Sequence, residues 1–170
     1  MGDGVGDGGA SLPGVRGPQI GSAHAPYPPA LLARIAARCE APPDREVCGF
    51  VVRRGQGLDL VEVPNAVDAA HAEDPVRFPR TAREAYLMDP EALLAVFEGL
   101  ARDGAEIAAV WHSHVEAPAI FSEQDRAYAL LEGEPALPGA EYLVVSVRGG
   151  VAVEVRRFAF AGGGFAEAPL

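Results

Sequence analysis

The chain has 170 residues, a formal net charge of −10 and 49% hydrophobic residues, proportions typical of one soluble domain of ordinary size. No apolar run approaches the roughly 18 residues that a membrane-spanning helix needs. The N-terminus is rich in Gly and Asp rather than basic and then apolar, so we expect a cytoplasmic protein without a membrane segment. An acidic chain without a Lys/Arg cluster is not expected to bind nucleic acid.

Three regions differ in composition. Residues 1–26 contain Gly, Pro, Asp and Ser without hydrophobic periodicity, which predicts a flexible tail. Residues 163–170 are predicted to form a short C-terminal tail, which leaves 27–162 as one folded domain. Cys39 and Cys48 lack CxxC spacing and are predicted to be reduced thiols, most simply placed in the core.

The first predicted elements are a helix and a hairpin. Beginning at Pro28, apolar residues recur with helical spacing as far as Cys39, after prolines that suit the first turn of a helix. The segments "EVCGFVVRR" and "LDLVEVPN", joined through 55–57, predict two strands of a hairpin. The polar, Pro-containing segment that follows them predicts an irregular connection.

The second half of the chain predicts alternating helices and strands. Asp89 can cap a helix that begins with Pro90 and ends near Gly104, with one apolar stripe. "EIAAVWHSH" predicts a strand in the middle of a sheet, buried on both faces. A helix from Ser122 and two strands joined at 149–150 complete the domain. This order predicts an α/β fold with a mixed β-sheet flanked by helices. The residues of the predicted stripe are Leu93, Leu94, Phe97, Leu100 and Ala101.

The segment "WHSHVEAPAIFSEQD" contains the residues of a candidate metal site. His112 and His114 are two residues apart in a predicted strand, so both imidazoles lie on one face where the strand ends. Ser122 suits a helix N-cap, which places Asp125 in the first turn, able to fold back toward the strand. Each pattern alone is common as a polar strand end or a capping box. Together they favour a three-ligand zinc site that leaves a fourth position to water.

With Glu46 in "REVCGF", the pattern resembles the signature of the JAMM (MPN-domain) zinc metalloproteases, and most of all their stand-alone prokaryotic branch. The resemblance extends from about Leu31 to Phe160, and it implies a cytidine-deaminase-like architecture. Two positions depart from it, because Val115 and Phe121 stand where these proteins usually have prolines. The departures leave the chemical groups intact and change residues at the rim of the site.

The resemblance also implies roles. His112, His114 and Asp125 would hold Zn²⁺, Glu46 would be the general base, and the Ser122 hydroxyl would donate to the oxyanion. The implied substrate is a ubiquitin-like or sulfur-carrier protein, cut after its C-terminal Gly-Gly, with a tail that can add to a sheet edge beside the zinc. A non-catalytic MPN-type scaffold and a ferrous centre on the same ligands are the alternatives.

Five further residues are weighed as neighbours of this site. Trp111 is predicted to lie in the core, and Ser113 to pack or to bond to the backbone. Cys48 is expected to be core filler or a close neighbour of the site, in preference to a zinc ligand, since three ligands are already present. His24 and His71 lie in polar segments and are expected to be solvated, with His71 a weaker candidate for substrate contact.

Overall fold

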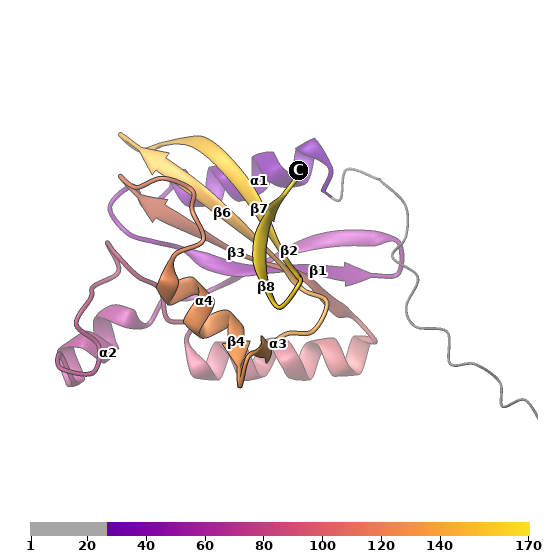
Figure 1. Ribbon diagram of the computed structural model, residues 1–170, viewed down its shortest axis with the longest axis horizontal. Helices are drawn as coiled ribbons and strands as arrows, with labels where there is room; N and C mark the ends of the chain where they lie inside the picture. The colour runs from indigo at the N-terminus through magenta and orange to yellow at the C-terminus, as the bar shows by residue number, and fades with distance from the viewer. Residues whose placement is uncertain (1–26) are drawn as a thin grey trace, which may run out of the picture.

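The computed structural model describes residues 27–170. The predicted tail 1–26, with His24, lies outside the described residues. Figure 1 shows a twisted sheet with helices beside it, and the strand order is β2-β1-β3-β6-β7-β8. The β3–β6 pair is parallel and the other neighbouring pairs are antiparallel, which confirms the predicted α/β fold with a mixed sheet. The six strands are β1 (Cys48–Arg54), β2 (Gly57–Val63), β3 (Glu106–Val115), β6 (Glu141–Arg148), β7 (Val151–Ala161) and β8 (Gly164–Ala168).

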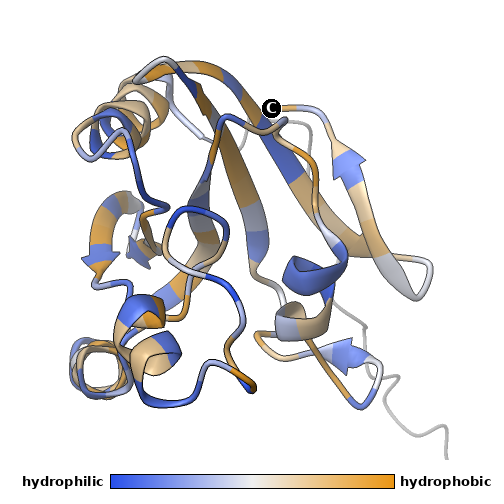
Figure 2. Ribbon diagram, turned by 90° about the vertical axis from the view of Figure 1, so that its left-hand side faces the viewer, coloured by the Kyte–Doolittle hydropathy of each residue, from blue (hydrophilic) through white to orange (hydrophobic). Residues whose placement is uncertain are grey.

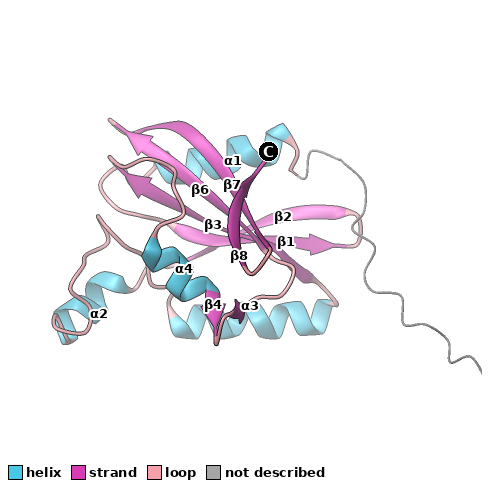
Figure 3. Cartoon of the chain, in the orientation of Figure 1, coloured by secondary structure: helices cyan, strands magenta, loops and turns pink. Residues whose placement is uncertain are grey.

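Helices cover both faces of the sheet (Figure 3). On one face, α1 buries three residues spaced four apart, which pack on odd-numbered strand residues such as Val51 and Trp111. On the other face, α3 and α4 pack on even-numbered strand residues such as Phe50 and Val110. Figure 2 shows hydrophobic residues along the strands in the middle of the sheet. The helices are α1 (Pro29–Glu40), α2 (Val67–Glu73), α3 (Pro90–Asp103) and α4 (Glu123–Ala129), and the short strands β4 (Leu130–Leu131) and β5 (Glu134–Pro135) pair separately.

Strand β3 lies in the interior of the sheet, as its continuous apolar run predicts. Its last seven residues, 109–115, are all buried, and it pairs with β1 on one side and β6 on the other. In the β1 register, Cys48 lies opposite His112. The histidines therefore stand at the C-terminal end of a strand that has no free edge.

Local signals at the predicted turns and caps match the structure. The Asp89 side chain accepts the Ala92 N–H at 2.9 Å, and α3 ends at Gly104 in the left-handed conformation. Gly149 and Gly150 both have positive φ, as a two-residue hairpin turn between β6 and β7 requires.

The predicted apolar stripe of α3 is partly wrong. Leu94 is 59% exposed and Phe97 is 38% exposed, although both belong to the predicted apolar stripe. Leu100 is buried, as predicted, and Leu93 is partly buried against the core, but the remaining inward residues are Ala92 and Val96. The buried face of α3 is therefore rotated about the helix axis from the predicted stripe, toward Ala92 and Val96.

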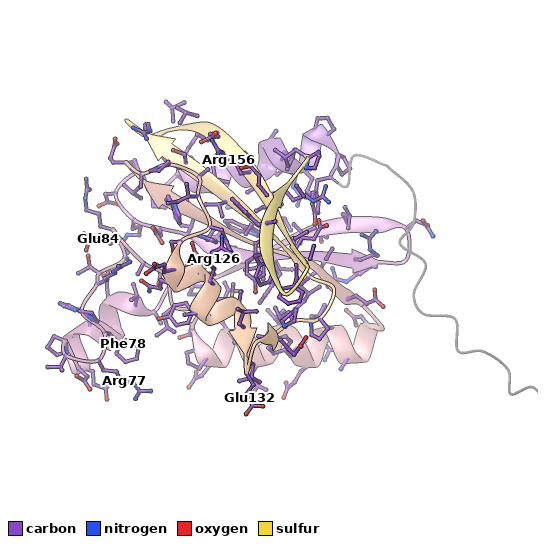
Figure 4. The ribbon with its side chains drawn as sticks, in the orientation of Figure 1. Arg77, Phe78, Glu84, Arg126, Glu132 and Arg156 are labelled. Carbon is purple, nitrogen blue, oxygen red and sulfur yellow. The ribbon has the colours of Figure 1, made fainter. Side chains whose placement is uncertain are left out.

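Two segments are more regular than the sequence pattern predicts. In the expected connection, Val67–Glu73 forms helix α2, whose Val67 is buried. At the C-terminus, the short tail expected at 163–170 is wrong for Gly164–Ala168, which forms β8 and pairs with β7. Contacts of Phe165 account for the extra strand. Its side chain is buried against Phe121. Its backbone carbonyl accepts a hydrogen bond of 2.8 Å from Arg126 of α4, which is labelled in Figure 4. Within residues 27–170, no helix is both long and apolar enough to cross a membrane.

Candidate metal centre

Three candidate ligands meet at the end of β3. His112, His114 and Asp125 each direct one ligand atom into a group whose members lie within 4.8 Å of one another, and all three residues are buried. The two Nε2 atoms are 3.2 Å apart. The Asp125 carboxylate lies 3.2 Å from His112 Nε2 through Oδ1 and 3.6 Å from His114 Nε2 through Oδ2. It is the only such group among the described residues.

These distances fit a tetrahedral metal ion. With metal–ligand bonds of about 2.0–2.1 Å, the atoms of a tetrahedral zinc site are separated by about 3.3 Å. Two imidazole nitrogens and one carboxylate oxygen are also donors that zinc accepts, with a fourth position left for water. The residues present therefore suit zinc in both donor type and spacing.

The local structure holds each ligand in place. His112 and His114 share one face because β3 is extended. His114 Nδ1 lies 2.9 Å from the Pro118 carbonyl, the kind of contact that orients a metal-binding imidazole. Asp125 and Ser122 form a capping box: the Ser122 hydroxyl accepts the Asp125 N–H at 3.1 Å, and Asp125 Oδ2 accepts the Ser122 N–H at 2.7 Å. The cap therefore fixes the carboxylate as well as the helix.

The pKa shifts of the candidate ligands favour the binding of a metal cation. Burial opposes ionisation of Asp125, yet the neighbouring histidines and Ser122 hold its pKa well below the usual range. Burial lowers the pKa of His112 below its ordinary value. Burial acts in the same direction on His114, but Asp125 and the Pro118 carbonyl outweigh it and leave that pKa raised. A buried carboxylate beside imidazole nitrogens is the environment in which a metal ion replaces a proton.

Glu46 lies beside this group although 66 residues separate it from His112 in sequence. Its backbone is held from two sides, since its N–H donates to the Ala82 carbonyl and Asn65 Nδ2 donates to the Glu46 carbonyl at 2.9 Å. Burial raises the pKa of the Glu46 carboxyl to about 8, against the charge of His114. A carboxyl group with a pKa near neutrality can both accept and release a proton at the working pH of most enzymes.

A small cavity separates these groups. It has a volume of about 20 Å³ and is bordered by Glu46, His114, Ser122 and Asp125. That volume accommodates about one water molecule. The Glu46 carboxyl group, the Ser122 hydroxyl and two of the three candidate ligands, His114 and Asp125, therefore border one space of molecular size.

The family model that matches is Prok-JAB, described as prokaryotic homologs of the JAB domain, and the match covers residues 28–160. The chain belongs to this family. The match confirms the predicted relationship to the JAMM (MPN-domain) proteins and to their prokaryotic branch.

One curated relative and two solved structures are also similar. The relative is the "Probable TtuB-protein conjugate cleaving protease" of Thermus thermophilus, 46% identical over 41 residues, which make up 24% of this chain and 28% of the relative. A solution structure from Desulfitobacterium hafniense has a TM-score of 0.58 at 20% identity, covering 82% of this chain and 86% of that one. A second, from Salinibacter ruber, has a TM-score of 0.52 at 21% identity, covering 83% and 86%. The two structures share the fold of this chain.

The other residues considered as neighbours of the site make structural contacts. Cys48 is buried on the ligand side of the sheet, but its thiol donates to the Val63 carbonyl and burial raises its pKa to about 12. The Ser113 hydroxyl accepts the Val47 N–H at 3.0 Å, and Trp111 is fully buried. His71 Nδ1 lies 2.6 Å from a backbone carbonyl and borders none of the cavities at the candidate centre.

The two departures from the resemblance are both accommodated in the core. Val115 is the last residue of β3 and is 8% exposed. Phe121 packs among Tyr142, Phe158 and Phe165, with ring centroids 4.9–5.3 Å apart. An aromatic cluster therefore anchors the chain just before Ser122, where the resemblance leads one to expect a proline.

Sequence reasoning missed the residues that the segment before α3 contributes. The Tyr86 ring lies 4.6 Å from the His112 ring and is buried, while Arg80 and Glu84 border the small cavity beside Glu46. These residues lie on an irregular segment without periodicity. Hydrogen bonds hold the segment beside Glu46: Asn65 donates to the Ala85 carbonyl and accepts the Leu87 N–H, and the Ala82 carbonyl accepts the Glu46 N–H.

Proposed function

We propose that the protein is a zinc-dependent peptidase or isopeptidase that hydrolyses the bond after the C-terminal Gly-Gly of a ubiquitin-like or sulfur-carrier protein. The observation that carries the proposal is the convergence of three metal-type ligands, two of which border a small cavity together with a buried carboxyl group and a hydroxyl group. A scaffold that serves only protein contacts has no need of this set of groups.

Each group has a role that its position suits. His112, His114 and Asp125 would hold zinc, which when bound lowers the pKa of water to about 7 and polarises a carbonyl group. The Glu46 carboxylate accepts a proton from the attacking water and passes it to the nitrogen of the leaving amine. The Ser122 hydroxyl donates to the carbonyl oxygen of the substrate as negative charge develops there. Because Ser122 Oγ already accepts the Asp125 N–H, its own proton is directed elsewhere.

Two observations support a glycine-terminated substrate. The cavity is small, and an extended backbone approaches such a centre closely only where the residues lack a Cβ. The relative from Thermus thermophilus is named for cleaving conjugates of the TtuB protein. The expected addition of the tail to a sheet edge needs revision, because β3 is paired on both sides. Residues of the irregular segment 80–86 border the small cavity instead.

The test uses a ubiquitin-like sulfur carrier from the same source, extended by one amino acid beyond its Gly-Gly and incubated with the zinc-loaded protein. We expect intact mass to show loss of the extension with the native protein and not with Glu46→Gln. Equal cleavage of a carrier with Val-Val in place of Gly-Gly would refute the tail preference. No cleavage of either carrier, with zinc bound, would refute the peptidase function.

A further inference from the structure

Two of the larger cavities that share residues with the small cavity differ in character. One, of about 360 Å³, is apolar and is formed largely by α3 and the sheet, and it meets the centre at Tyr86 and Tyr128. The other, of about 300 Å³, shares Glu46, His114 and Ser122 with the centre. We call the second the arginine cleft, because Arg80 and Arg83 line it.

The proposed chemistry identifies which side receives the leaving group. Glu46 passes its proton to the departing nitrogen, so the leaving group must lie next to Glu46. Glu46 borders the arginine cleft and does not border the apolar cavity. The leaving group therefore occupies the arginine cleft, and the tail of the carrier reaches the centre from the other side.

Arg80 and Arg83 belong to a cluster of basic residues in an acidic chain. The protein has a net charge of −10, yet Arg77, Arg80 and Arg83 are three of its 14 basic residues within seven positions. Among the described residues, neither Arg80 nor Arg83 has a carboxylate within salt-bridge distance, although other arginines of the chain do. Two guanidinium groups without an internal partner are available to an anion from outside.

Hydrogen bonds of the backbone between the two arginines hold this segment beside Glu46. Ala82, which lies between them, is buried, and its carbonyl accepts the Glu46 N–H. The Ala82 N–H in turn donates to Asp68 Oδ1 at 2.7 Å, which ties the segment to α2. Arg80 also borders the small cavity itself. Arg80 and Glu46, from which the departing nitrogen receives its proton, therefore line the same space.

We propose that Arg80 and Arg83 bind the free α-carboxylate of a single amino acid that follows the Gly-Gly of the carrier. In that residue the carboxylate carbon is two bonds from the scissile nitrogen, so it enters the arginine cleft when the nitrogen faces Glu46. Hydrolysis breaks the C–N bond, places the water-derived hydroxyl on the glycine carbonyl carbon and the proton on the amine, and releases one free amino acid. This inference rests on the proposed function and names its substrate.

Glu84 offsets part of the positive charge of the arginine cleft. It lines the same cleft, so the residues of segment 80–84 contribute one net positive charge there. Figure 4 shows Glu84 apart from Arg77, which lies beside Phe78 and α2. Arg77 does not line the arginine cleft. It borders a third cavity, which Arg80 also lines, so it provides a control of the same charge on the same segment outside the cleft.

The experiment compares two substrates with one enzyme. The carrier is extended beyond Gly-Gly by one alanine, either as the free acid or as the C-terminal amide, and kcat and KM are measured for both with zinc-loaded protein. We expect kcat/KM to favour the acid by about tenfold, mainly through KM, as for a charge-assisted pairing at a partly solvated site. The double variant Arg80→Gln/Arg83→Gln should bring the acid-to-amide ratio close to one, Arg77→Gln should keep it, and Glu84→Gln should raise it.

The ratio of kcat/KM for the acid to kcat/KM for the amide is insensitive to effects on the chemical step, because both substrates share that step. Equal kcat/KM for acid and amide with the native protein would overturn the inference and leave the proposed function standing. A preference that persists in the double variant would also overturn it, because some other group would then bind the carboxylate. Absence of cleavage for both substrates, with zinc content confirmed, would refute the proposed function and this inference with it.

Discussion

Ser122 is expected to serve both the helix and the reaction, and the two contributions can be measured separately. Its hydroxyl accepts the Asp125 N–H at 3.1 Å, so Ser122→Ala removes an N-cap and should lower the free energy of unfolding by about 1 kcal/mol. Ser122→Gly should cost only a few tenths of that, because glycine is tolerated at an N-cap. Both variants lack the hydroxyl proton, so both should lose about 10² to 10³ in kcat on the extended carrier.

Zinc should remain in both variants. The Ser122 N–H donates to Asp125 Oδ2 at 2.7 Å, and that bond does not depend on the side chain. Ser122→Thr retains a hydroxyl and is the matched control for folding and turnover. The measurements are chemical denaturation, zinc content and kcat. If Ser122→Gly turned over like the native protein, the oxyanion role would be refuted. If both variants lost zinc, the loss of rate would instead reflect a displaced Asp125.

Three other changes test different parts of the structure. Glu46→Gln should keep zinc and fold but lose about 10² to 10⁴ in kcat, because an amide cannot accept the proton; loss of zinc by elemental analysis would make Glu46 a ligand. In the metal-free protein, burial raises the pKa of Glu46 from 4.5 to about 8, so stability should fall as the pH rises through this range. Urea denaturation in a chelator should show that fall, and the same fall in Glu46→Gln would contradict the assignment. Gly49→Ala should lower stability by about 1–3 kcal/mol in denaturant unfolding, because a Cβ there meets the Val61 carbonyl and the Trp111 ring; unchanged stability would mean that the strand shifts freely.

The candidate ligands could be found from sequence because their geometry is local. Residues two apart in a strand share a face, and a capping box sets its own conformation over four residues. Both patterns can therefore be recognised from the spacing of residues in the sequence. Glu46 is different, because its place depends on the register that sets Cys48 opposite His112 across two strands. No local pattern encodes that register, and only the resemblance to a known family pointed to Glu46.

The segment before α3 could not be interpreted from sequence for a related reason. Tyr86, Arg80 and Arg83 lie on irregular backbone, where periodicity carries no signal, and their positions follow from the side chains of Asn65 and Asp68. Strand β8 was missed because its pattern has one large apolar residue, Phe165, whose partners come from distant parts of the chain. Tertiary contacts decide both cases.

The central claim is that His112, His114 and Asp125 hold one zinc ion, and zinc content tests it most directly. The purified protein should contain about one zinc per chain, because three protein ligands and a water complete a tetrahedral site. We expect His112→Ala, His114→Ala and Asp125→Ala each to lose most of this zinc in elemental analysis after dialysis against a weak chelator, and Glu46→Gln to retain it. Full zinc occupancy in all three alanine variants would contradict the account.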